Sequence, residues 1–204
     1  MSELTNQQSF YSPLVDRAIG FAAQKHEGQH RKIGSVPYIA HPIGVAMLLM
    51  RMGCRDEVIA AAVLHDTVED TGASLQDIRK QFGQEVADIV DGCTELPRKF
   101  NNWEERKQNM IEKLRHASLE VKLVVAADKF HNLQHITKSK KKEGSAVWEK
   151  FSRGPELQAW YYRAMLDSIL ANLPDTADQY PIFDQLPALI NDLFDGIPTR
   201  APQS

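Results

Sequence analysis

The residues with the clearest chemical potential are His65, Asp66, Glu69 and Asp70, one histidine and three carboxylates within six positions. An apolar run, residues 58–64, leads directly into them, so their side chains are expected at the buried end of a core helix. A buried charge is costly unless it is paired or bound to a metal ion. In a continuous helix, Glu69 lies one turn beyond His65, and Asp70 one turn beyond Asp66. The segment therefore predicts a metal site with two further carboxylates beside it.

Two further segments supply side chains of the same kind. His41 precedes Pro42 at a predicted helix start, where the first turn tolerates proline. Asp128 ends another apolar helical run, residues 124–127, and Asn132 lies one turn further on. Alone, each would be more typical of a structural histidine or of an aspartate that hydrogen-bonds two helices. Together with the first segment they offer two imidazoles and two carboxylates, a mixed donor set that suits Mn²⁺ or a similar metal better than Mg²⁺.

The elements that must position these residues follow a helical period almost throughout. Apolar residues recur at spacings of three and four, and no alternation of period two persists beyond a few residues. We predict helices at residues 12–27, 43–52, 57–69, 75–82, 84–93, 103–116, 119–136, 146–151, 156–172 and 182–196. The stretches at 28–39, 97–103 and 138–144 are expected to be loops or turns. The sequence therefore predicts an all-α fold, a bundle of about ten helices.

The length of 204 residues suits one domain. We predict a single domain over residues 1–204, with its core at about 12–172 and a C-terminal helix at about 182–196. The composition, 43% hydrophobic and 25% charged, is that of an ordinary globular protein. A net charge of −3 argues against a general binder of nucleic acids or membrane surfaces.

The two cysteines, Cys54 and Cys93, stand apart, and neither lies in a CxxC motif. This indicates two reduced thiols rather than a disulfide framework or a thiolate zinc site. The N-terminus lacks the basic and apolar regions of a signal peptide. No apolar run approaches the roughly 18 residues that a membrane span needs. We therefore expect a cytoplasmic protein with no membrane partner.

Five segments carry a resemblance to a known family: HEGQHRKIG at 26–34, PYIAHP at 37–42, HDTVEDT at 65–71, FG at 82–83 and ADKFHN at 127–132. A His-Asp pair after an apolar helix, with an upstream His-Pro and a downstream Ala-Asp-Lys, resembles the HD superfamily of metal-dependent phosphohydrolases. Together, the five segments more closely resemble the hydrolase domain of RelA/SpoT proteins, over about residues 12–172. The chain stops where those larger proteins would begin a synthetase domain, so it is similar to a stand-alone small alarmone hydrolase.

The resemblance implies four ligands for Mn²⁺: His41, His65, Asp66 and Asp128. It also implies that Glu69 and Asp70 orient the attacking water and accept its proton. A bound metal would lower the pKa of that water and polarise the phosphate, and a carboxylate beside a cation stays ionised, as a general base must. The implied reaction removes the 3′-pyrophosphate from guanosine tetra- or pentaphosphate, giving GDP or GTP plus pyrophosphate.

The resemblance further implies contacts to a small nucleotide substrate. The candidate contacts are Arg31, Lys32, Asn132, Arg153 and Tyr161, with Lys99 and Lys107 as further phosphate contacts. A guanidinium such as that of Arg31 can stack on a base, and the ammonium of Lys32 can neutralise phosphate. Without the family context, a solvated basic loop would explain Arg31 and Lys32, and core packing would explain Tyr161 equally well.

Other interpretations stay open. Residues 26–30 fit the H-E-x-x-H pattern of zinc proteases, but that site needs both histidines on one helix face, and Gly28 indicates that the helix ends inside the motif. An HD-type site could instead act on ppApp-type alarmones, on the 2′-phosphate of NADPH or on a nucleotide monophosphate. A nucleotide sensor without catalysis would not need Glu69 and Asp70. The residues do not distinguish guanine from adenine, nor do they give the oligomeric state.

Overall fold

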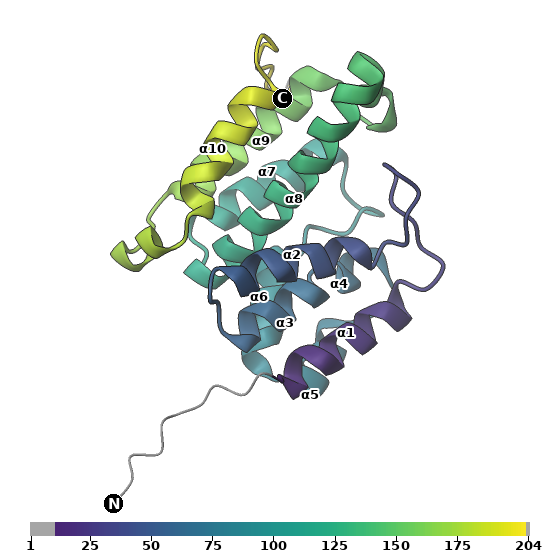
Figure 1. Cartoon of the computed structure of the whole chain (residues 1–204), viewed down its shortest axis with the longest axis vertical. Helices are drawn as coiled ribbons and strands as arrows, with labels where there is room; N and C mark the ends of the chain where they lie inside the picture. Colours follow the sequence, from purple (N-terminus) through teal and green to yellow (C-terminus); the bar gives the residue numbers. More distant parts are fainter. Residues whose placement is uncertain (1–10, 203–204) are drawn as a thin grey trace, which may run out of the picture.

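The computed structural model describes residues 11–202, and every regular element in this part of the chain is helical (Figure 1). The α-helices are α1 (Pro13–Lys25), α2 (Ala40–Arg51), α3 (Asp56–Leu64), α4 (Thr67–Asp70), α5 (Leu75–Phe82), α6 (Gln84–Cys93), α7 (Trp103–Arg115), α8 (Leu119–Glu143), α9 (Pro155–Leu170) and α10 (Ile182–Leu193). Two short 3-10 helices span Gly144–Lys150 and Asp175–Gln179. The predicted all-α fold is confirmed.

Residues 1–10 and 203–204 lie outside the described part of the chain. Most of the N-terminal stretch from which we predicted the lack of a signal peptide is therefore outside the described residues. Among residues 11–202, no helix combines the length and the apolar character needed to cross a membrane.

Helix α3 is the central element of the fold, and His65 and Asp66 follow its C-terminal end. All seven of its residues from Val58 to Leu64 are buried, and it contacts α1, α2, α6 and α8 (Figure 1). Burying a large aliphatic side chain such as Ile59 or Leu64 contributes about 1.5–3 kcal/mol relative to leaving it exposed. This packing holds the C-terminal end of α3, where the polar residues begin, in one place inside the protein.

The predicted continuous helix at 57–69 is wrong, because the chain breaks between α3 and α4. The His65 Nδ1 atom bonds the Ala62 carbonyl at 2.7 Å, and the Thr67 hydroxyl donates to the Leu64 carbonyl at 2.7 Å. In a continuous helix these carbonyls would accept from backbone amides four residues on, so the side chains compete with the helix ladder. Asp66 precedes α4 and makes no capping hydrogen bond, which leaves its carboxylate for the site.

The predicted turn at 138–144 is also wrong, since α8 continues through the lysine-rich tract to Glu143. Lysine is a good helix former, and cations are favourable near a helix C-terminus. The Lys140 ammonium donates to the Leu193 carbonyl at 2.8 Å, which ties α8 to the end of α10. Gly144, with a φ of +63°, ends the helix. The C-terminal helix α10 ends at Leu193 rather than at 196.

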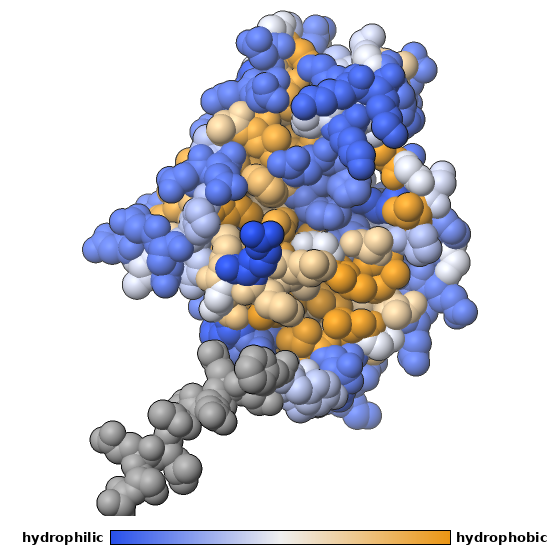
Figure 2. Space-filling model, viewed as in Figure 1, coloured by the Kyte–Doolittle hydropathy of each residue, from blue (hydrophilic) through white to orange (hydrophobic). Residues whose placement is uncertain are grey.

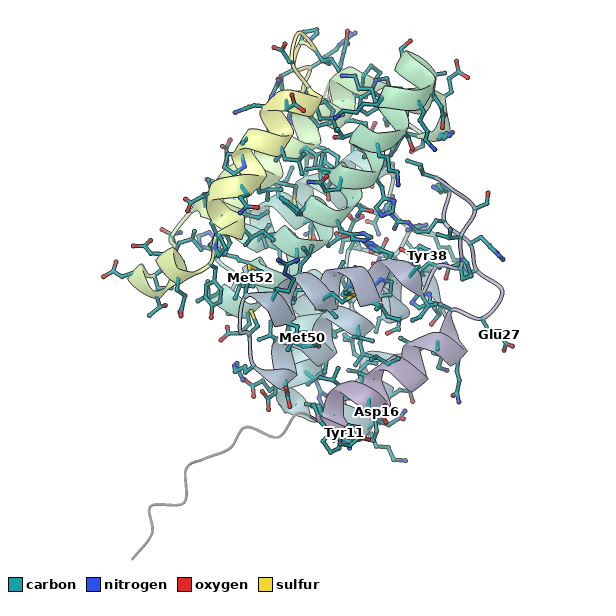
Figure 3. All side chains as sticks on the ribbon, viewed as in Figure 1. Tyr11, Asp16, Glu27, Tyr38, Met50 and Met52 are labelled. Carbon is teal, nitrogen blue, oxygen red and sulfur yellow. The ribbon has the colours of Figure 1, made fainter. Side chains whose placement is uncertain are left out.

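Helix α2 buries one side and exposes the other. Its buried residues include His41 near the N-terminal end, and the helix packs on α3 and α8. Met47 and Met50 are more than half exposed. Figure 2 shows apolar surface on this face of the molecule, and Figure 3 labels Met50 on the outer side of this helix. The chemistry on α2 is therefore confined to its buried N-terminal end.

Candidate active site

The four predicted metal ligands come from α2, the break after α3, and α8, and they converge. The His41 Nε2 atom lies 3.0 Å from Asp128 Oδ1 and 3.7 Å from Asp66 Oδ2. The His65 Nε2 atom lies 3.1 Å from Asp66 Oδ2 and 3.8 Å from Asp128 Oδ1. Ligand atoms about 2.0–2.2 Å from one ion lie roughly 3–4 Å from each other. The four side chains are therefore spaced like donors around a single cation.

One atom in this group tests whether the residues fit a metal. His65 is 5% exposed, and its Nε2 atom has no hydrogen-bond partner among the described residues. It is close to Asp66 but not aligned for a hydrogen bond, whereas the Nδ1 atom is held by the Ala62 carbonyl. A buried polar atom without a partner is costly. A cation bound by His41, His65 and Asp66, whose ligand atoms lie within 4.8 Å of one another, would remove that cost.

The charges of the group are strongly coupled. Burial lowers the pKa of His65, but the Asp66 and Asp128 carboxylates outweigh burial and raise it to about 9. Burial would raise the pKa of Asp66, yet the His65 and His41 imidazoles hold it below its usual range. The pKa of Asp128 is likewise held low, against burial, by the Lys129 ammonium and His41. The two aspartates are thus ionised and favour a positive charge between them.

Tyr38 is a residue of this site to which sequence reasoning assigned no role. Its hydroxyl donates to Asp66 Oδ2 at 2.6 Å, and burial together with Asp66 raises its pKa, so it remains a donor. It lies before the N-terminal end of α2 (Figure 3). Its place in the PYIAHP motif, three positions before His41, is the only signal that pointed to it. Tyr38 orients the Asp66 carboxylate, as partners of metal ligands commonly do.

Glu69 and Asp70 lie on α4, next to the ligand group, and both accept hydrogen bonds from the side chain of Arg98. The Arg98 guanidinium donates to Glu69 Oε1 at 2.9 Å and to Asp70 Oδ1 at 2.8 Å. Burial raises the pKa of both carboxyls, and Arg98 opposes that rise. Arg98 comes from the basic stretch at 97–103, whose role the sequence left open. Because no periodicity constrains a loop residue, only the local excess of positive charge indicated it.

The shared guanidinium predicts a pH effect. A general base works in its ionised form, so the rate falls as the pH falls through its pKa. Replacing Arg98 by alanine removes the opposing charge, which raises the pKa of Glu69 and Asp70 further. We expect the acidic limb of the kcat/KM profile to move to higher pH. The matched control is Lys99→Ala, whose ammonium lies over the Phe100 ring instead, and it should leave the limb in place. An unmoved acidic limb in the Arg98 variant would contradict the prediction that Glu69 and Asp70 provide the general base.

A pocket of about 440 Å³ opens beside these groups. Its basic lining residues are Arg31, Lys32, Arg98, Arg106, Lys107, Lys129 and Lys150. Asp70 is the one acidic residue of this lining. Tyr38, Lys129 and Asn132 also line it, and each bonds a predicted metal ligand. Five of the seven basic side chains pair with carboxylates, whereas Arg31 and Lys32 have no carboxylate partner among the described residues. The pocket is therefore continuous with the ligand group and offers two unpaired cations to a negatively charged ligand.

The structure brings most of the predicted substrate contacts to this pocket. Arg31 Nη2 donates to Asn132 Oδ1 at 2.8 Å, and the Arg31 guanidinium lies 5.7 Å from the centre of the Tyr38 ring. Tyr161 is 4% exposed, and its hydroxyl has no hydrogen-bond partner among the described residues. The Lys107 ammonium lies 4.6 Å from the centre of the Tyr161 ring. These side chains combine charge, an aromatic face and an unpaired hydroxyl in one lining.

Two of the candidates lie elsewhere. The Arg153 guanidinium pairs with Glu104 at 2.6 and 3.0 Å and lies over the Trp103 ring, and it is not part of the pocket lining. Lys99 is exposed and is not part of the lining either. Contact of Arg153 with a ligand would require the Glu104 pair to open.

The zinc-protease interpretation of residues 26–30 does not fit the structure. Helix α1 ends at Lys25, and Gly28 has a φ of +74°, which is outside helical geometry. His26 is buried with its Nδ1 atom 2.7 Å from Gln29 Oε1, whereas His30 is exposed. The two histidines therefore do not share a helix face.

Comparison with known proteins agrees with this geometry. The sequence profile of the HD domain (HD_4) matches residues 18–153. The chain therefore belongs to the HD domain family. HD domains are metal-dependent, and the His41, His65 and Asp66 group is the candidate metal site of this one. The resemblance to the HD superfamily that the sequence motifs indicated is confirmed.

Named relatives include guanosine-3′,5′-bis(diphosphate) 3′-pyrophosphohydrolase MESH1 of Danio rerio, 43% identical over 59% of this chain and 67% of the relative. The protein of the same name from Homo sapiens is 42% identical over 59% of this chain and 68% of its own length. A probable guanosine-3′,5′-bis(diphosphate) 3′-pyrophosphohydrolase of Synechocystis is 40% identical, but the match covers only 17% of it. The similarity therefore includes both short and much longer proteins.

Two solved structures are similar over nearly their whole length. The crystal structure of lmo0812 from Listeria monocytogenes has a TM-score of 0.70 and 42% identity, and the match covers 76% of this chain and 98% of that one. A structure described as a metazoan orthologue of SpoT that hydrolyses ppGpp has a TM-score of 0.67 and 26% identity, over 88% and 96% of the two chains.

Proposed function

We propose that this protein is a Mn²⁺-dependent hydrolase that removes the 3′-pyrophosphate of guanosine tetra- or pentaphosphate, giving GDP or GTP plus pyrophosphate. The observation that carries the proposal is the continuity of three features. The His and Asp group, the Glu69 and Asp70 pair and a pocket with seven basic side chains adjoin one another. The printed names of the MESH1 relatives and of the SpoT orthologue support the substrate.

The donor set supports manganese. His41, His65, Asp66 and Asp128 would hold the ion through two nitrogens and two oxygens, a mixture more typical of manganese than of magnesium. When bound, such a cation supplies Lewis-acid polarisation of the phosphate and lowers the pKa of water. Tyr38 keeps Asp66 oriented, and the bond from His65 to the Ala62 carbonyl keeps the ring nitrogen Nε2 turned toward the other ligands.

The other residues of the site divide the remaining work. Glu69 and Asp70 are placed to orient the attacking water and to accept its proton. Arg98 bonds both carboxylates, so it opposes the rise in their pKa that burial causes. Lys32 neutralises a phosphate, whereas contact of Lys107 with phosphate requires its pair with Glu95 to open. The Tyr161 ring lines the same pocket, and its buried hydroxyl has no partner among the described residues. Arg31 and Asn132 contact the ribose or base, and the hydrogen bond between them supports a shared role.

Metal binding should also be visible in the stability of the protein. A ligand at 100 times its Kd raises the free energy of unfolding by about 2.7 kcal/mol. For a chain of this size that corresponds to an increase in Tm of roughly 5–11 °C. We expect this increase when Mn²⁺ is added to chelator-treated protein and followed by calorimetry. The Asp128→Asn variant should show little or none of it, and an equal increase in that variant would mean that Mn²⁺ binds elsewhere.

A substrate panel tests the proposal. Metal-stripped protein plus Mn²⁺ is assayed on ppGpp, ppApp, NADPH and a nucleoside monophosphate, and pyrophosphate and orthophosphate are measured separately. We expect pyrophosphate from ppGpp. Faster release of pyrophosphate from ppApp, or release of orthophosphate from NADPH, would change the proposed substrate but not the proposed active site. The absence of turnover on every nucleotide would overturn the enzyme and leave a nucleotide sensor.

The proposal places this activity in one domain spanning the whole chain and in the cytoplasm. The free state of Cys54 and Cys93 supports a reducing compartment.

A further inference from the structure

Three histidines meet where α2 packs on α8. His41 lies on α2, and His131 and His135 lie one turn apart on α8. The Nδ1 atoms of His41 and His131 are 2.9 Å apart. The His131 ring centre is 5.0 Å from that of His41 and 4.6 Å from that of His135. His131 and His135 have no role in the chemistry described above, yet His131 touches a residue of the ligand group directly.

The hydrogen bond between the two imidazoles has only one arrangement that leaves His41 able to bind a cation. The Nε2 atom of His41 faces Asp66 and Asp128, so its lone pair must be free there. The proton of the neutral ring is then on Nδ1 and is donated to the Nδ1 lone pair of His131. His131 must carry its own proton on Nε2. A neighbouring acceptor of this kind sets the tautomer and the orientation of a liganding histidine.

The two histidines of the ligand group are oriented by different means. His65 bonds the Ala62 carbonyl of its own helix, at 2.7 Å, so its orientation depends on local backbone alone. His41 stands at the start of α2 and instead depends on a side chain from α8, 90 positions along the chain. Its orientation therefore depends on the packing of α2 against α8.

Gly44 makes this packing possible. It follows His41 by one helical turn, so both face the same side of α2. A Cβ atom at position 44 would lie 2.3 Å from His131 Nε2 and 2.8 Å from its Cδ2, and real Cβ atoms do not approach other atoms so closely. Alanine is a better helix former than glycine. What glycine provides here is the space in which the His131 ring sits.

We propose that His131 is a positioning residue for the metal ligand His41, and that Gly44 provides the space that lets it reach that ligand. The inference rests on the metal site of the proposed function. It predicts that substitution of His131 lowers the affinity for Mn²⁺. It also predicts that substitution of Gly44 lowers this affinity only by displacing the His131 ring.

Four variants test this: His131→Ala, His131→Asn, Gly44→Ala and the Gly44→Ala, His131→Ala double variant. The readout is the affinity of metal-stripped protein for Mn²⁺ by titration, with kcat and KM measured at saturating Mn²⁺. Loss of an outer partner typically costs 10–100-fold in metal affinity. We expect that loss in His131→Ala. His131→Asn should recover most of it, because its amide oxygen can accept at about the place of Nδ1.

The glycine variants separate positioning from general destabilisation. Gly44→Ala should reproduce the loss of His131→Ala, and the double variant should be no worse than His131→Ala, because the clashing ring is gone. A control, His135→Ala, removes a ring that lies 4.6 Å from the His131 ring at a tilted angle and is not hydrogen-bonded to His41, and it should retain Mn²⁺ affinity.

Two outcomes would overturn the inference: wild-type Mn²⁺ affinity in His131→Ala, or multiplying losses from the two substitutions in the double variant. If His131→Ala does not fold, His131→Asn and Gly44→Ala decide the matter alone. Weaker Mn²⁺ binding by Gly44→Ala than by His131→Asn supports positioning, and equal or stronger binding overturns it. Failure of the wild-type protein to bind Mn²⁺ would instead overturn the proposed metal site.

Discussion

Replacing Asp128 with asparagine should abolish metal binding and turnover together. Its Oδ1 atom lies 3.0 Å from His41 Nε2, and the carboxylate accepts from Lys129 at 2.7 Å and from Asn132 at 2.5 Å. The amide keeps the shape but loses the charge that holds a cation. Because even an outer partner contributes 10–100-fold in affinity, loss of a ligand charge should weaken Mn²⁺ binding by more than about 100-fold.

The measurement is metal content after dialysis, together with Mn²⁺ titration and turnover. Asp192→Asn on the exposed side of α10 removes the same charge far from the site and should leave all three unchanged. Asp128→Ala is the harsher variant, since it also leaves the Lys129 ammonium without its partner. Retention of wild-type Mn²⁺ affinity by Asp128→Asn would remove this residue from the ligand group.

The Glu69→Gln, Asp70→Asn double variant should show the opposite pattern, normal metal binding without turnover. Neither carboxylate is among the four converging ligands, and both face Arg98 instead. A positioned general base typically contributes 10²–10⁴-fold to the rate, so kcat should fall by about that factor. Equilibrium titration with Mn²⁺ and single-turnover kinetics on ppGpp measure the two properties separately.

Glu112→Gln provides the matched control, because Glu112 is exposed on α7 and pairs with His116, away from the candidate site. Hydrolysis at the wild-type rate by the double variant would show that another group accepts the proton. Loss of Mn²⁺ binding in the double variant would move one of these carboxylates into the metal site.

Three of the four candidate metal ligands could be predicted from the sequence because each belongs to a regular pattern. His65 and Asp66 follow an apolar helical run, and Asp128 ends another. Burial of these runs brings the polar residues at their ends into the interior. The prediction for His41 was weaker, since one histidine before a proline is more often structural than a metal ligand. Its assignment depended on the resemblance, and the structure places it within 3.0 Å of Asp128.

The sequence could not predict features that depend on competition between side chains and backbone. The break after α3 requires His65 and Thr67 to bond carbonyls of the preceding turn, and both residues are also compatible with a continuous helix. Arg98 reaches Glu69 and Asp70 from a loop, where no helical period constrains the direction of its side chain. His131 and His135 fitted a partly solvated helix face equally well. Only the contact between α2 and α8 distinguishes them.

The charges of this protein are unevenly distributed. The pocket lining has seven basic side chains and one acid, a formal charge of +6, whereas the whole chain carries −3, so the rest of the chain carries −9. Five of the seven lining cations pair with carboxylates, so Arg31 and Lys32, which have no carboxylate partner in the described part of the chain, remain to attract a polyanion from solvent. Salt screens these forces beyond about 8 Å at physiological ionic strength. Added salt should therefore raise KM for a nucleotide polyphosphate, while the short-range chemistry and kcat stay nearly constant.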